Sequence, residues 1–218
     1  MKSIMEITHI GHASFRLRGK DGAVMTDPYD SSMVGLSYPK LSATIVTISH
    51  NHDDHNKANL IEGNPLIISG PGEYESGGIK VYGISTFHDG EKGTKRGQNT
   101  VYRIEIDGIS VIHLGDLGHK LIDSQVDSLD GVDVLLVPVG GEFTLDAKDA
   151  AEVVSQLEPK IIIPMHYNKK ELNQKFFAAL SGVDAFLKEM GKTGITSQPK
   201  LSLTKEKLPV EPTVVVLE

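Results

Sequence analysis

The sequence HNHDDH at residues 50–55 places three imidazoles and two carboxylates within six positions. It directly follows residues 43–49 (ATIVTIS), a β-branched run typical of a strand covered on both faces. His50 and His52 are two residues apart, so an extended backbone points both side chains the same way. Neutral imidazole and carboxylate are preferred ligands of zinc and similar divalent ions. The stretch therefore predicts a metal site on a loop after a buried strand; a chance cluster of polar residues is the alternative.

The composition places limits on that site and on the class of protein. With 218 residues, 39% of them hydrophobic, the chain is long enough for one sizeable core, which predicts a single domain over residues 1–218. Cysteine is absent, so any metal must be held by His, Asp, Glu or backbone oxygen. The formal net charge of −7 disfavours generic nucleic-acid binding.

Targeting signals are not evident in the sequence. No apolar stretch approaches the ~18–20 residues of a membrane span, so no membrane partner is expected. The N-terminal segment lacks the long apolar core of a signal peptide. The expected location is the cytoplasm.

Short apolar or alternating runs predict a protein with many strands. The strongest hairpin signal is Asp107-Gly108 between two such runs. Strands are expected over residues 4–8, 13–18, 23–26, 43–49, 66–69, 78–85, 100–106, 109–114, 132–139, 160–164 and 213–217. Residues 89–98 predict an exposed, mobile loop, and Glu73 and Tyr74 lie in an expected glycine-rich turn.

Helices are fewer, and they concentrate in the second half. A short helix is expected over residues 56–61. A second one follows strand 132–139, capped by Asp146 or Thr144, and a longer one covers residues 170–189 with a break or bend near Gly182. The apolar face of the second helix comprises Ala150, Val153, Val154 and Leu157. Two sheets sandwiched by helices are the expected α/β architecture.

Together with GHASF at 11–15, HLGD at 113–116 and PMHY at 164–167, the HxHxDH pattern resembles the metallo-β-lactamase fold superfamily. More narrowly, it is similar to the small metal-dependent hydrolases that include relatives of ascorbate-phosphate lactonases. The resemblance extends over most of the chain. It implies a four-layer αββα sandwich with a metal site at one edge of the two sheets.

The resemblance also implies a ligand set for two metal ions. His50, His52 and His88 would hold the first ion, whereas Asp54, His55 and His166 would hold the second, and Asp116 would bridge both. Each position comes just after an apolar run, as expected for ligands carried on loops at strand ends. Structural roles are the alternatives: a polar residue closing a strand for His88, a turn carboxylate for Asp116 and a core-edge histidine for His166.

Two positions distinguish the chain from other branches of that superfamily. Asp116 stands where lactamases with a thiolate ligand have Cys, and His52 stands where di-iron oxygen-reducing relatives have Glu. Hydrolysis is therefore favoured over redox chemistry.

Four further residues are candidates for supporting roles. Asp27 (TDPY) would orient the metal loop through hydrogen bonds, with a turn before Pro28 as the alternative. His12 would face the site or lie between strands as a structural histidine. His119 follows Asp116 by three residues and would reach substrate or water. Tyr167 would donate a hydrogen bond to substrate or pack beside His166.

These residues predict a hydrolase of a small ester, lactone or phosphoester. Two divalent ions ~3.5–4 Å apart would share a water and lower its pKa from ~15.7 toward ~7, giving a bridging hydroxide. Asp54 would accept a hydrogen bond from this water, and His119 would protonate the leaving group. The metal charge suits a small anionic substrate. Zinc is expected, with manganese, iron or nickel as alternatives.

Two other functions stay open. A metal-dependent nuclease would use a basic rim, although the chain has no Trp for base stacking. The rim residues would be Lys92, Lys95, Arg96, Lys169 and Lys170. The third hypothesis is a non-enzymatic metal-binding protein that keeps the remnant of an active site. It is disfavoured because such a remnant would have lost one or more metal ligands. The oligomeric state cannot be predicted from the sequence.

Overall fold

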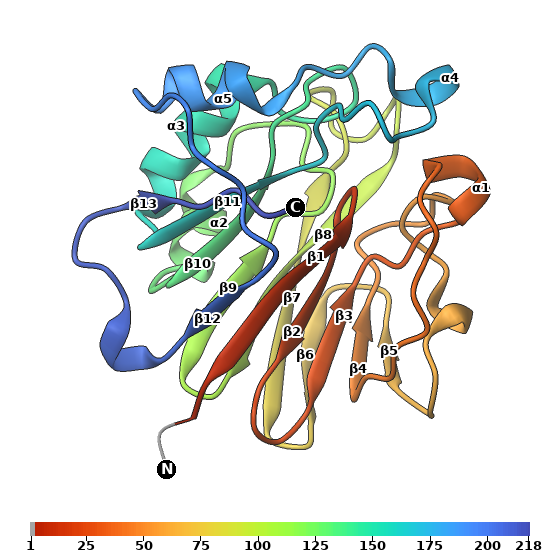
Figure 1. Cartoon of the computed structure of the whole chain (residues 1–218), viewed down its shortest axis with the longest axis vertical. Helices are drawn as coiled ribbons and strands as arrows, with labels where there is room; N and C mark the ends of the chain where they lie inside the picture. The colour runs from red at the N-terminus through yellow and green to blue at the C-terminus, as the bar shows by residue number, and fades with distance from the viewer. Residues whose placement is uncertain (1–2) are drawn as a thin grey trace.

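The computed structural model describes residues 3–218, in which two mixed β-sheets face each other (Figure 1). The first sheet has the order β12 (Leu201–Leu203), β1 (Met5–Gly11), β2 (Ser14–Arg18), β3 (Ala23–Thr26), β4 (Ile45–Thr47), β5 (Leu66–Ile68). The second has the order β13 (Thr213–Val214), β11 (Ile161–Met165), β10 (Val134–Pro138), β9 (Ile109–His113), β8 (Gln98–Ile106), β7 (Ile79–Phe87), β6 (Gly72–Ser76).

The main core lies between the sheets. In β1 every second residue is buried, as the strand period of two requires for a strand with one face on the core. Met5 and Ile7 of β1 pack in the same apolar cluster as Ile104 of β8 and Leu136 of β10. All five residues of β10 are buried because a second apolar cluster covers the other face of its sheet.

Helices contribute the part of that second cluster that lies outside the sheet. They are α3 (Ala147–Leu157), α5 (Val183–Glu189) and the short α2 (Asp123–Ser128) (Figure 1). The α3 face buries the expected Ala150, Val153, Val154 and Leu157. Asp146, one of the two expected caps, accepts a hydrogen bond from Asp149 N at 2.8 Å.

The outer face of the first sheet has a thinner cover of short segments. The 3-10 helix η1 (Ala58–Leu60) packs there against Met25 and Val46. Beside it, α1 (Ser31–Val34) packs near α4 (Gln174–Phe177) around Tyr29. A further 3-10 helix, η2 (Lys205–Lys207), precedes β13. The expected αββα sandwich is confirmed, with one helical layer reduced to short pieces. Within residues 3–218, no helix is long and apolar enough to cross a membrane.

Several local predictions were wrong. The expected break near Gly182 is present, because Gly182 is the N-cap of α5, but the expected long helix before it is only the short α4, which follows Asn173. Glu73 and Tyr74 lie in strand β6 rather than in a turn, paired with β7. Strand β12 and helices α1 and α2 were not predicted from the sequence. These elements are short or exposed, so their periodic signal is weak.

Strand direction brings the loops of interest to a common edge. β1, β3 and β4 run the same way, since β2 is antiparallel to both β1 and β3 and β4 is parallel to β3. In the other sheet β7, β9 and β11 run the same way by similar pairing. The carboxyl ends of each set of three strands therefore lie at one edge of their sheet.

Candidate metal centre

All seven predicted metal ligands follow the carboxyl ends of those strands. HNHDDH follows β4, and the other three ligands follow β7, β9 and β11. The supporting candidates His12 and Asp27 follow β1 and β3. Residues far apart in the sequence thus meet because six strands of two sheets end at the same place.

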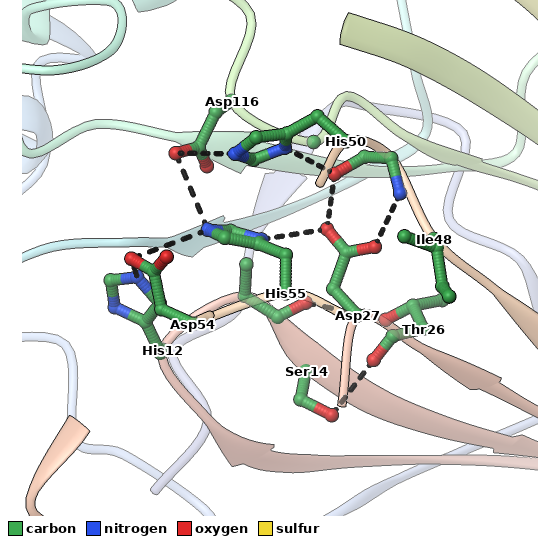
Figure 2. Close-up of polar contacts among 12 residues, drawn as sticks. His12, Ser14, Thr26, Asp27, Ile48, His50, Asp54, His55 and Asp116 are labelled. Atoms are coloured by element: carbon green, nitrogen blue, oxygen red, sulfur yellow. Dashed lines mark hydrogen bonds and ion pairs between the residues drawn. The ribbon is translucent and has the colours of Figure 1, made fainter. Parts of the chain in front are cut away.

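Asp116 lies at the centre of this cluster and is 2% exposed. Figure 2 shows its carboxylate directed at the imidazoles of His50 and His55. Its Oδ2 is surrounded by four Nε2 atoms, at 3.2 Å from His166, 3.3 Å from His55, 3.3 Å from His88 and 3.9 Å from His50. One carboxylate facing four imidazoles is a geometry suited to bridging two cations.

The donor atoms of the cluster form three groups, one of which contains Asp116. His50, His52 and His88 offer nitrogen atoms that all lie within 4.8 Å of one another. Asp54, His55 and His166, together with His12, form another such group, and a third joins His50, His55 and Asp116. The division follows the two ligand sets that the sequence resemblance implies.

Unsatisfied polar atoms are concentrated in this cluster. Within residues 3–218, thirteen buried side-chain nitrogen or oxygen atoms lack a hydrogen-bond partner. Six of them belong to His12, His50, His55, His88, Asp116 and His166. Buried polar atoms are normally paired, because leaving one unpaired costs about 1–3 kcal/mol. Divalent cations would satisfy those that face the centre, so the residues present fit a metal site.

A hydrogen-bond network orients two of the imidazoles (Figure 2). Asp27 Oδ2 accepts hydrogen bonds from Ser49 Oγ at 2.6 Å and from His55 Nδ1 at 2.9 Å. Because the Ser49 hydroxyl proton points to Asp27, its oxygen accepts from His50 Nδ1 at 2.9 Å. Both histidines therefore carry a proton on Nδ1 and direct Nε2 toward Asp116.

The two imidazoles differ in protonation, since His50 is neutral and His55 is charged before a metal binds. Burial lowers the pKa of His50 to about 2, so its ring is neutral at pH 7. Burial also opposes a charge on His55, but the carboxylates of Asp116 and Asp54 raise its pKa well above the ordinary value. A proton and a metal ion compete for the same Nε2, so a cation beside these carboxylates would displace the proton.

Three residues of the site have a left-handed backbone. The φ angles are 55° at His12, 40° at Asp27 and 53° at His166, although none of them is glycine. Such conformations cost about 1–3 kcal/mol each and persist only where the surroundings impose them. One constraint is the hydrogen bond from His166 N to the His12 carbonyl oxygen at 3.1 Å, which joins the ends of β11 and β1. His12 also contacts Asp54, with Nε2 at 3.3 Å from Oδ2.

Asp116 is held by residues that the sequence reading missed. Asn99 Oδ1 accepts a hydrogen bond from Asp116 N at 2.9 Å. Gly115 has φ +57°, and a Cβ there would lie 2.4 Å from Asn99 Oδ1 and 2.6 Å from Ser49 Cβ. The glycine therefore lets the Asp116 turn approach the metal loop. The GD pair after an apolar run could have signalled such a turn, but nothing in the sequence connects it with Asn99 or Ser49.

The structure does not bring His119 or Tyr167 into the cavity beside the cluster. His119 Nε2 accepts a hydrogen bond from Phe87 N at 3.2 Å, and Nδ1 donates one to the Lys120 carbonyl at 2.7 Å. Tyr167 packs in the apolar cluster under α3, and burial raises its pKa to about 12.

The cavity beside the cluster has a volume of about 390 Å³, which is the scale of a small ligand. Five residues of the metal cluster line it, together with apolar and charged side chains from other segments. It is lined by Met33, His52, Asp53, Asp54, His88, Arg96, Asp116, Phe143, His166, Phe176 and Phe177.

Known proteins with similar sequences and structures support a family assignment. The profile of the Beta-lactamase superfamily domain matches residues 6–166. A UPF0173 metal-dependent hydrolase of Thermoplasma acidophilum is 31% identical, covering 84% of this chain and 92% of its own. Another UPF0173 metal-dependent hydrolase, from Thermococcus onnurineus, is 29% identical; the match covers 76% of this chain and 85% of the relative. A crystal structure of a Thermotoga maritima protein, proposed to be a Zn-dependent hydrolase of the metallo-beta-lactamase superfamily, shares 41% identity with a TM-score of 0.82 and 98% coverage of both chains.

Proposed function

The chain belongs to the beta-lactamase superfamily and to its UPF0173 metal-dependent hydrolases, and from this premise we propose a dinuclear hydrolase of a small ester, lactone or phosphoester. The observation that carries the proposal is the position of Asp116 among four imidazoles. A single ion would leave one of the two donor groups around this carboxylate unused. Zinc is the expected metal, because neutral imidazole and carboxylate are its common ligands.

The residues divide the work by position. His50, His52 and His88 would hold one ion, Asp54, His55 and His166 the other, and Asp116 both. When bound, such a pair of ions supplies an ionised water near neutral pH and polarises the oxygen of the electrophile. The protein keeps the Nε2 lone pairs of His50 and His55 aimed at the centre through Ser49 and Asp27.

Asp54 is our candidate for the group that accepts a hydrogen bond from the attacking water. Its carboxylate lines the cavity and lies 3.3 Å from His12 Nε2. Contact with His12 fixes the position of Oδ2, so Asp54 can accept a hydrogen bond from the attacking water through a carboxylate oxygen. Because the His119 ring is held by backbone groups, we assign no proton transfer to it.

The basic rim required for a nuclease gains little support. Lys95 pairs with Glu91 at 2.6 Å. The Lys169 ammonium lies 5.2 Å from the centroid of the Tyr167 ring. Of the five predicted rim residues, Arg96 alone is among the residues that line the cavity. We therefore favour a small substrate over a nucleic acid. A single domain over residues 1–218 and a cytoplasmic location stay predictions.

Metal reconstitution tests the proposed function. The metal-free protein would be loaded with zinc, manganese, iron or nickel and offered lactones, chromogenic esters, a chromogenic phosphodiester and plasmid DNA. We expect turnover of a small substrate, and its loss in Asp116→Asn. Asp133→Asn is the matched control, because Asp133 is equally buried but lies outside the centre. Full activity of Asp116→Asn, or no turnover by fully loaded wild type, would refute the proposal.

A further inference from the structure

Arg96 places a cation in the wall of the cavity. Its guanidinium carbon lies 5.4 Å from the centroid of the Phe143 ring, which also lines the cavity. Within residues 3–218, no ion pair and no side-chain hydrogen bond involves this guanidinium. A guanidinium over an aromatic face keeps N–H donors available for an anion.

The backbone of Arg96 is fixed relative to the metal centre. The Asp89 carboxylate accepts hydrogen bonds from four backbone N–H groups of the following loop, those of Glu91, Gly93, Lys95 and Arg96, at 2.8–3.0 Å. His88 N also donates to the Gly97 carbonyl at 3.0 Å. The loop that carries Arg96 therefore closes on the residue beside His88, and Arg96 is positioned with that ligand.

The other charges of the cavity are already partnered. Asp53 pairs with Lys57 at 2.6 Å. Asp54 and Asp116 belong to the metal cluster. Arg96 is therefore the charged residue of the cavity wall whose side chain still has N–H donors available for a substrate. Phe143, Phe176 and Met33 provide apolar surface next to it.

We propose that Arg96 determines specificity by binding a carboxylate or phosphate group of the substrate while Phe143 and Phe176 pack against its apolar part. The inference rests on the proposed function and narrows its substrate class. The substrate is a small ester or lactone with an anionic group separate from the bond that is cleaved. Arginine suits this role because its planar fork binds carboxylate or phosphate through two parallel hydrogen bonds.

Calorimetry on the zinc-loaded protein tests the binding step without turnover. The probes are benzoate, phenylphosphonate and, as the neutral counterpart, benzamide. We expect Arg96→Gln to weaken at least one anion by about tenfold or more, a loss typical of a charge-assisted bidentate contact. Binding of benzamide should not change. If Arg96→Gln weakens benzoate, the recognised group is a carboxylate; if it weakens phenylphosphonate, the recognised group is a phosphate.

Lys95→Gln is the matched control, because this neighbouring cation pairs with Glu91 outside the cavity. It should change the affinity for either anion less than about twofold. Equal anion affinity in wild type and Arg96→Gln would overturn the inference, as would absence of anion binding by wild type. Unchanged thermal unfolding of Arg96→Gln would exclude misfolding as the cause of a loss.

Kinetics separate this inference from the proposed function. On an anionic ester, Arg96→Gln should raise KM with little change in kcat, because the contact forms in both ground and transition states. The KM of the matching neutral ester should stay constant. Turnover without dependence on Arg96 would sink the inference alone, whereas Arg96-dependent anion binding without turnover of any substrate would sink the proposed function alone.

Discussion

Single hydrogen bonds set the direction of the imidazoles in this centre. Ser49 and Asp27 coordinate no metal in the proposed arrangement, yet they decide which nitrogen of His50 and His55 carries the proton. Outer partners of this kind typically change metal affinity by 10–100-fold when they are removed.

At this scale we predict that Ser49→Ala weakens metal binding. The change leaves His50 Nδ1 without its acceptor, so the ring loses its fixed tautomer and orientation. The affinity for one of the two ions should fall by about 10–100-fold. Competition with a chromogenic chelator measures both affinities.

Ser110→Ala is the control for that experiment. Ser110 is a buried serine on β9 whose hydroxyl has no hydrogen-bond partner. Its removal should leave both metal affinities unchanged. An equal loss in the two variants would mean that Ser49 acts through general stability rather than through His50.

The proposed ligand set came from the family resemblance, and its members lie together because each of them follows an apolar run that forms a strand. Asp54 and His166 lie in recognisable motifs, HNHDDH and PMHY, whereas the neighbours of His88 form no tight motif. The roles of Ser49 and Asn99 depend on contacts with residues 17 to 22 positions away, which no local pattern encodes. His119 illustrates the converse, since closeness to Asp116 in sequence does not place its ring in the cavity.

Elements with strong periodicity were predicted well. The Asp107-Gly108 turn joins β8 and β9 as expected, and α3 begins after Asp146. Between residues 170 and 189 the expected break near Gly182 is present, but the helical parts are shorter than expected: α4 packs by α1, and α5 packs by α3. Tertiary packing of two short segments outweighed local helix propensity.

We predict at this scale that Asp146→Ala destabilises α3. The Asp146 side chain accepts a hydrogen bond from Asp149 N, and removing an N-cap typically costs about 1 kcal/mol. Thr144→Ala removes the other cap candidate and should change the free energy of unfolding by less than about 0.5 kcal/mol. Urea unfolding followed by circular dichroism measures both; a larger cost for Thr144→Ala would contradict the assignment.

A buried carboxylate connects distant parts of the chain at the ends of the second sheet's strands that lie opposite the metal centre. Asp133 accepts hydrogen bonds from Lys160 at 2.9 Å, from Lys205 at 2.6 Å and from Ser110 N at 3.0 Å. It thus joins the starts of β9, β10 and β11 to the C-terminal segment. Burial would raise the pKa of Asp133, but the hydrogen bonds from the two lysines hold it below its usual 3.8.

This network predicts how stability depends on pH. A lowered folded-state pKa means that the carboxylate stabilises the fold above about pH 4 and that this contribution disappears as the pH falls through the folded-state pKa. Asp133→Asn should therefore lower the free energy of unfolding at pH 7 by about 1–3 kcal/mol. The difference from wild type should shrink as the pH falls below about 4 and through the lowered folded-state pKa of Asp133. Urea midpoints at each pH measure it, and a constant difference would contradict the assignment.

The most direct test of the account is an anomalous-scattering map of the crystallised protein loaded with zinc. We predict two peaks per chain, one among His50, His52 and His88 and the other among Asp54, His55 and His166, with Asp116 between them. A single peak, or peaks away from these residues, would contradict the dinuclear centre on which the proposed hydrolysis depends.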